Sequence, residues 1–153
     1  MSSREYSVPK AATDVKPQPL WAISTKMNAS TLNKILKDGS KIQLLKTEIN
    51  AEVFAYEKLM QKTGSTISLH FIEDESTFLN TQGLLNLINQ TLNGSLNNIE
   101  LAYICDCLTL VENLEFENNK VKEVVFEIAD PEINGGYKSV EELKSITKSL
   151  QIK

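Results

Sequence analysis

Two cysteines flank an aspartate at Cys105, Asp106 and Cys107, and thiolate and carboxylate groups so placed could bind a metal ion. A structural zinc site needs four ligands, which usually come as two separated pairs. This chain has no second cysteine pair, and its one histidine, His70, lies far away in the sequence. We therefore predict no metal site and interpret both cysteines as small side chains inside a buried helix.

Catalytic chemistry finds little support in the residue types. A nucleophile paired with histidine would have to use His70, which lies in an alternating segment typical of a strand or of a buried structural residue. The acidic run from Glu73 to Ser76 could supply a general acid and base, but acidic residues before a helix usually stabilise its N-terminus. Phosphate-binding, dinucleotide-binding and calcium-binding motifs do not occur. We expect no catalytic residue and no cofactor.

Asp106 lies inside an apolar segment, where an unpaired carboxylate would cost several kcal/mol. We interpret it as bonded to a donor such as a lysine, or as part of an exposed polar strip. The alternative is that it contacts a partner molecule.

The elements that must position these groups are predicted to be helices. Between Lys41 and Lys62 the apolar residues recur every three or four positions, which places them on one helical face. These residues are Ile42, Leu45, Ile49, Val53, Tyr56 and Met60. Further helices are expected within residues 28–40, capped by Ser30 or Thr31, and 83–94.

The second half of the chain predicts three more helices. The first runs from Asn98, as its cap, to Val111 and is apolar on nearly every side, which is typical of a central helix. The second runs from Lys120 to Ala129. The last follows a capping box at Ser139 and Glu142, and its predicted inner face consists of Val140, Leu143, Ile146, Thr147 and Leu150.

These patterns predict a mainly α fold: a single compact helical domain, residues 21–153, with about five or six helices and at most a minor β element near 67–71. Residues 1–20 hold three of the four prolines and are expected to form a flexible N-terminal arm. The N-terminus does not have the pattern of a signal peptide, and the longest apolar run is about half of the roughly 20 residues that span a bilayer. We expect a soluble, cytoplasmic protein with no membrane partner.

Charge is distributed unevenly along the chain, whose net charge is −4. Residues 98–132 hold nine acids and two lysines, a net of −7. This concentration is either an ordinary solvated surface or a patch that docks a basic partner. Nucleic acid is disfavoured as a partner, because binding it requires a basic surface. The candidate partner-binding residues are Glu112, Glu115, Phe116, Glu117, Glu123, Glu127 and Asp130, with Phe116 either an apolar anchor among the charges or a core residue.

The segment LAYICDCLTLVENLEFENNKVKEVVFEIADPEING, residues 101–135, resembles the helical, carboxylate-rich part of bacterial immunity proteins that neutralise polymorphic or contact-dependent growth inhibition toxins. The resemblance implies a cognate toxin, often a nuclease, whose basic active-site cleft the immunity protein blocks. The resemblance does not predict a particular fold, because such proteins have many unrelated folds.

Our hypothesis from the sequence is therefore a non-catalytic binding protein that neutralises a basic protein partner, most plausibly an antibacterial toxin. One alternative is an adaptor or regulatory domain that dimerises through apolar helix faces. A second is a carboxylate-dependent enzyme, which would place two acids facing each other in a pocket.

Overall fold

A computed structural model describes residues 27–39, 41–60, 71–112, 114–129, 131 and 136–151. The expected N-terminal arm, His70 and Asp130 lie outside this part of the chain. Six helices are described: α1 (Ala29–Asp38), α2 (Ile42–Met60), α3 (Thr81–Leu92), α4 (Asn98–Leu108), α5 (Asn119–Ile128) and α6 (Val140–Gln151). The described strands are β1 (Met27–Asn28), β2 (Phe71–Ile72), β3 (Thr77–Leu79) and β4 (Leu114–Phe116). The predicted mainly α fold with a minor β element is confirmed.

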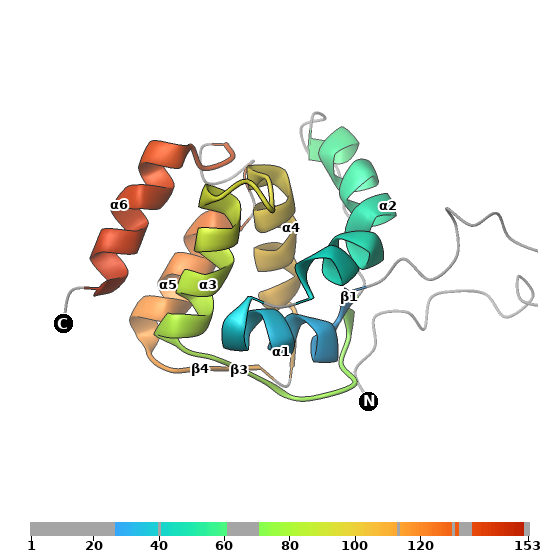
Figure 1. Ribbon diagram of the computed structural model, residues 1–153, viewed down its shortest axis with the longest axis horizontal. Helices are drawn as coiled ribbons and strands as arrows, with labels where there is room; N and C mark the ends of the chain where they lie inside the picture. The colour runs from blue at the N-terminus through green and yellow to red at the C-terminus, as the bar shows by residue number, and fades with distance from the viewer. Residues whose placement is uncertain are drawn as a thin grey trace, which may run out of the picture.

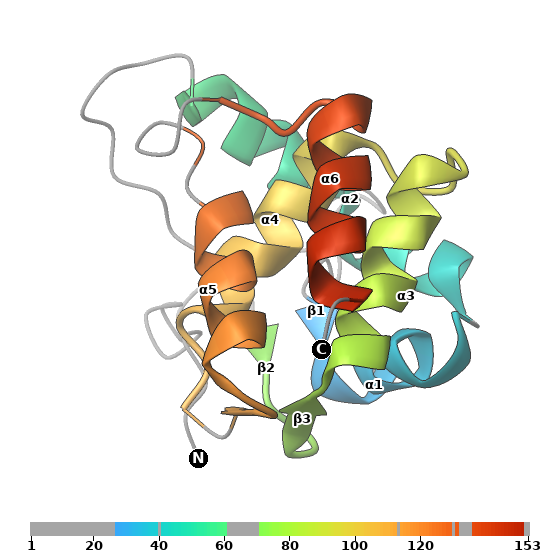
Figure 2. The same ribbon diagram turned by 90° about the vertical axis from the view of Figure 1, so that its left-hand side faces the viewer.

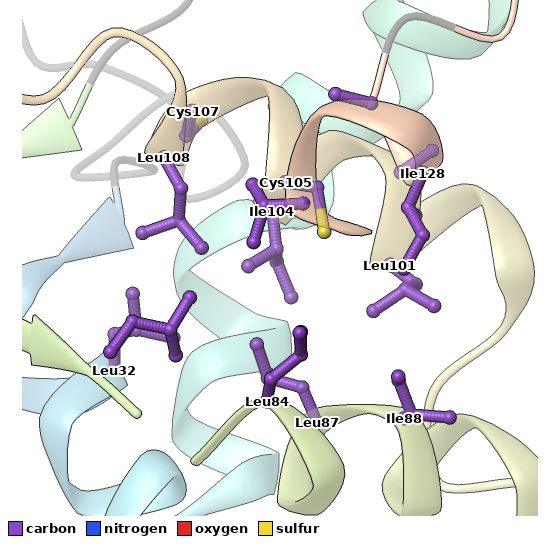
Figure 3. Packing of buried hydrophobic residues seen from close by; sticks show 14 of the residues in the cluster. Leu32, Leu84, Leu87, Ile88, Leu101, Ile104, Cys105, Cys107, Leu108 and Ile128 are labelled. Atoms are coloured by element: carbon purple, nitrogen blue, oxygen red, sulfur yellow. The ribbon is translucent and has the colours of Figure 1, made fainter. Parts of the chain in front are cut away.

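Helices α3, α4, α5 and α6 lie side by side, and α1 packs across the end of α3 (Figures 1 and 2). Helix α4 is buried on most sides, from Leu101 through Cys105 to Leu108. Figure 3 shows leucine and isoleucine side chains of α1, α3 and α5 converging on α4. This arrangement confirms that the segment apolar on nearly every side forms the centre of the domain.

Helix α2 shows the predicted amphipathic pattern. Leu45, Ile49 and Tyr56 are buried, and Ile42 and Val53 are partly buried against the core. In α6 the prediction is confirmed for Leu143, Ile146 and Leu150, but it is wrong for Val140, which is 49% exposed. Val140 is the first residue of α6, so its side chain precedes the turns that pack against α3 and α5.

The short strands pair in parallel, and each pair joins segments far apart in the sequence. β1 pairs with β2, and β3 pairs with β4. The register of the second pair places Thr77 opposite Leu114, Phe78 opposite Glu115 and Leu79 opposite Phe116. The sheet formed by β3 and β4 lies where the chain enters α3 and α5, so it connects the starts of two core helices (Figure 2).

The observed N-cap residues of α1 and α4 differ from the predicted ones. Helix α1 begins after Asn28 instead of Ser30 or Thr31, and carboxylates from other segments cover its N-terminus. Glu48 of α2 accepts hydrogen bonds from the Asn28 backbone and side chain (both 3.1 Å) and from Thr31 Oγ1 (2.8 Å). Asp74 accepts from the Ser30 backbone amide at 2.9 Å. Negative charge at this helix end is favourable, because the free N–H groups there carry partial positive charge.

Helix α4 is capped by Asn97, one residue earlier than predicted, through a capping box with Glu100. The capping box at Ser139 and Glu142 is present as predicted, with N–H donors 2.8 and 3.1 Å from the side-chain oxygens. Within the described ranges, none of the helices combines the length and the apolar character needed to span a membrane.

Candidate protein-binding surface

The chain leaves the core at the end of α4 and returns through β4, which alternates between the two faces of its sheet. Leu114 and Phe116 are partly buried and pack against the core, whereas Glu115 between them is exposed. Phe116 therefore contributes to core packing instead of standing out as an apolar anchor. The alternation follows from the strand itself, because successive side chains point to opposite faces.

An exposed phenylalanine lies on the neighbouring strand instead. Phe78 is 54% exposed, although Thr77 and Leu79 on either side of it are buried. The parallel register sets Phe78 directly beside Glu115 on the outer face of the sheet. Among the described residues Glu115 takes part in no ion pair. The outer face thus combines a large apolar ring with a carboxylate that the fold leaves to solvent.

A pocket of about 390 Å³ opens at the start of β3 and β4. Its lining comprises Ser76, Thr77, Phe78, Glu112, Leu114 and Glu115. Two of the predicted carboxylates, Glu112 and Glu115, thus lie at one site. We name the surface formed by this pocket and its lining residues the β3–β4 face.

Glu117 has a different role. Its Oε1 accepts hydrogen bonds from the backbone amide (2.8 Å) and the hydroxyl (2.9 Å) of Thr81, at the first residue of α3. These two hydrogen bonds lower the pKa of the Glu117 carboxyl below its usual value. Glu117 is exposed, but its carboxylate is already engaged in holding the start of α3 next to β4.

The remaining predicted acids lie on α5, where the charges are mixed. Glu123 and Glu127 are both exposed, as are Lys120 and Lys122. Glu127 Oε2 lies 3.7 Å from Nζ of the buried Lys138, and Lys122 Nζ lies 6.0 Å from the ring centre of the exposed Phe126. The predicted acidic face therefore contains three kinds of carboxylate: those around the pocket, one helix cap, and a pair on α5 of which Glu127 neutralises a lysine.

The Cys105–Asp106–Cys107 segment forms no metal site with any described residue. Both thiols are free and buried, and burial raises the pKa of each above its usual value. Asp106 accepts a hydrogen bond from the Tyr56 hydroxyl of α2, and Glu52 of α2 accepts one from the Tyr103 hydroxyl of α4. Asp106 thus has a hydrogen-bond donor, the hydroxyl of Tyr56.

The sequence analysis missed Thr77 and Phe78, which are central to the β3–β4 face. The alternation of Thr77, Phe78 and Leu79 was the available signal, but three residues of alternation are too few to indicate a strand. The preceding acids, Asp74 and Glu75, drew attention to a helix start. Asp74 does serve a helix, but that helix is α1, 44 residues earlier, and not the one that follows.

Comparison of the chain with protein-family models, with curated proteins and with solved structures gives no significant match.

Proposed function

We propose that this protein is a non-catalytic binding protein that docks a basic protein partner through the β3–β4 face, with Glu123 of α5 extending the negative surface. The observation that carries the proposal is the exposed Phe78 beside the exposed Glu115 on a paired strand. Aromatic side chains are enriched at the centres of protein interfaces, where a few residues dominate the binding energy.

Electrostatics supports a basic partner. The pocket is lined by two carboxylates, and no described lysine or arginine takes part in its lining. Such a surface attracts basic proteins and repels polyanions, and it raises the rate of encounter more than it raises the final affinity. The resemblance of residues 101–135 to immunity proteins makes a toxin the first class of partner to test, with inhibition by covering its active-site cleft.

The proposal is tested by capture from cells that encode this chain. A tagged wild-type protein and a Glu115→Lys/Glu123→Lys variant are compared by quantitative mass spectrometry of the bound proteins. We expect the wild type to retain a basic protein and the variant to lose at least about 90% of it, since reversal replaces attraction with repulsion. Glu127 is left unchanged, because Glu127→Lys would place a second cation beside the buried Lys138.

A matched control carries the same change in net charge elsewhere. Glu57 on α2 and Glu141 on α6 are exposed and do not line the pocket. The Glu57→Lys/Glu141→Lys variant should retain the partner. Equal loss from both variants would show that only net charge matters, and equal retention by all three proteins would contradict the proposal.

A further inference from the structure

We propose that the pocket of the β3–β4 face receives an arginine side chain of the protein partner. The inference rests on the proposed function and names the group that the site recognises. It is carried by three observations at one place: the pocket itself, a buried hydroxyl without a hydrogen-bond partner, and an aromatic ring beside a carboxylate.

The hydroxyl belongs to Thr77. This residue is 3% exposed and lines the pocket, and among the described residues its Oγ1 has no hydrogen-bond partner. A buried polar atom without a hydrogen-bond partner destabilises the protein, so a bound group that donates a hydrogen bond to it would stabilise the complex.

The side chains that line the pocket favour a cation that is also planar. Glu115 offers two acceptor oxygens, which match the paired N–H donors of a guanidinium group. The neighbouring ring of Phe78 offers a face on which that planar group can stack. A lysine ammonium would gain the charge interaction but neither the paired geometry nor the stacking, and an anion would be repelled by Glu112 and Glu115.

The size of the pocket fits this occupant. A volume of about 390 Å³ lies near the lower end of the range of roughly 300–1,000 Å³ typical of small-ligand pockets. It can accommodate one long side chain together with the peptide that carries it. The site lies at the edge of a strand pair, so the partner's backbone can approach from solvent.

The test uses short peptides and the ¹⁵N-labelled full-length protein. The probe is acetyl-Gly-Ser-Arg-Ser-Gly-amide, and matched peptides carry lysine or the uncharged citrulline in place of arginine. We expect the arginine peptide to shift the amide resonances of residues 76–79 and 114–116 in a saturable way at millimolar concentration. Affinity for the lysine peptide should be at least about three-fold weaker, and that for the citrulline peptide at least about ten-fold weaker.

Three variants locate the contacts. Glu115→Gln and Phe78→Ala should each weaken binding of the arginine peptide by about five-fold or more. Thr77→Val should weaken binding without lowering the midpoint of thermal unfolding, because it removes a hydroxyl that has no partner in the free protein. Glu141→Gln and Phe54→Ala change an exposed carboxylate on α6 and an exposed ring on α2, neither of which lines the pocket, and should leave the affinity unchanged.

Equal binding of the arginine and citrulline peptides would overturn the assignment, as would wild-type affinity in both Glu115→Gln and Phe78→Ala. The proposed function fails separately. If the arginine peptide does not bind but the Glu115→Lys/Glu123→Lys variant loses its partner, the docking surface stands and the arginine pocket is wrong. If the peptide binds but the double variant keeps its partner, the proposed docking surface is wrong.

Discussion

Among the described residues, some carboxylates hold helix ends, some accept hydrogen bonds from buried tyrosines or lie beside a lysine, and Glu115 faces solvent. Glu48, Glu100, Glu117 and Glu142 each accept a hydrogen bond from a backbone amide at or next to a helix start. Glu115 does not, and it lies beside an exposed ring. An acid's type and its place in the sequence do not distinguish these roles, because Glu117 bonds to Thr81, 36 residues away.

Because its pKa is lowered in the folded protein, Glu117 should make the free energy of unfolding change with pH in the acid range. A carboxyl whose pKa is lowered in the folded state contributes stability above its unfolded pKa, near 4.3, and that contribution is lost as the pH falls through the folded pKa. We expect Glu117→Ala to be less stable than the wild type at neutral pH. The difference should shrink toward zero in acid, as measured by urea unfolding at a series of pH values.

Glu123→Ala is the control for this prediction, because Glu123 is also exposed but caps no helix. Its unfolding free energy should follow that of the wild type across the pH series. A constant difference between Glu117→Ala and wild type at every pH would show that the carboxylate charge has no part in holding α3.

Among the elements, helices α2 and α4 are joined by two tyrosine–carboxylate hydrogen bonds that run in opposite directions. Tyr56 of α2 donates to Asp106, and Tyr103 of α4 donates to Glu52. The two rings meet edge to face, with their centres 5.5 Å apart. Burial, followed by the bond to Asp106, raises the pKa of the Tyr56 hydroxyl above its usual value.

Tyr56→Phe keeps the ring and removes one of these bonds. Because the acceptor is a carboxylate, we expect the unfolding free energy to fall by about 1–3 kcal/mol. A raised tyrosine pKa contributes stability below the unfolded value, near 10, and that contribution is lost as the pH rises. Wild-type stability should therefore decline more steeply above about pH 10 than that of Tyr56→Phe. Urea unfolding at neutral and alkaline pH measures both effects, and unchanged stability at neutral pH would contradict the prediction.

Helices were predictable because their signals are local. The α2 stripe of Leu45, Ile49 and Tyr56 repeats over several turns, and the capping box at Ser139 spans four residues. The pairing of β3 with β4 was not predictable in this way. It joins three-residue strands 37 positions apart, from Thr77 to Leu114, and neither strand shows enough alternation to be recognised alone.

The candidate site was also predictable only in its local features. Exposure of Glu112, Glu115, Glu123 and Glu127 could be expected from their charge, and the structure places all four at the surface. Their grouping depends on tertiary contacts, which brought Glu112 and Glu115 to one pocket and Glu127 to Lys138. Asp130 lies outside the described residues, so its part in the surface remains a prediction.

At the scale of the whole molecule, the proposed docking surface is the β3–β4 face, whose pocket is lined by Glu112 and Glu115. The rival account, dimerisation through apolar helix faces, would use other exposed residues, such as Leu44 and Phe54 of α2. The two differ in their response to salt. At physiological ionic strength, attraction between exposed charges is largely screened beyond about 8 Å, so added salt weakens it. Apolar association is not weakened by salt.

The most direct test of the account is the rate of association with the captured partner, measured by stopped-flow fluorescence over a range of ionic strengths. We predict that the wild-type rate constant falls by at least about ten-fold between low and physiological salt, and that the Glu115→Lys/Glu123→Lys variant associates slowly at every salt concentration. A wild-type rate that does not change with salt, or that the double variant shares, would contradict docking through the β3–β4 face.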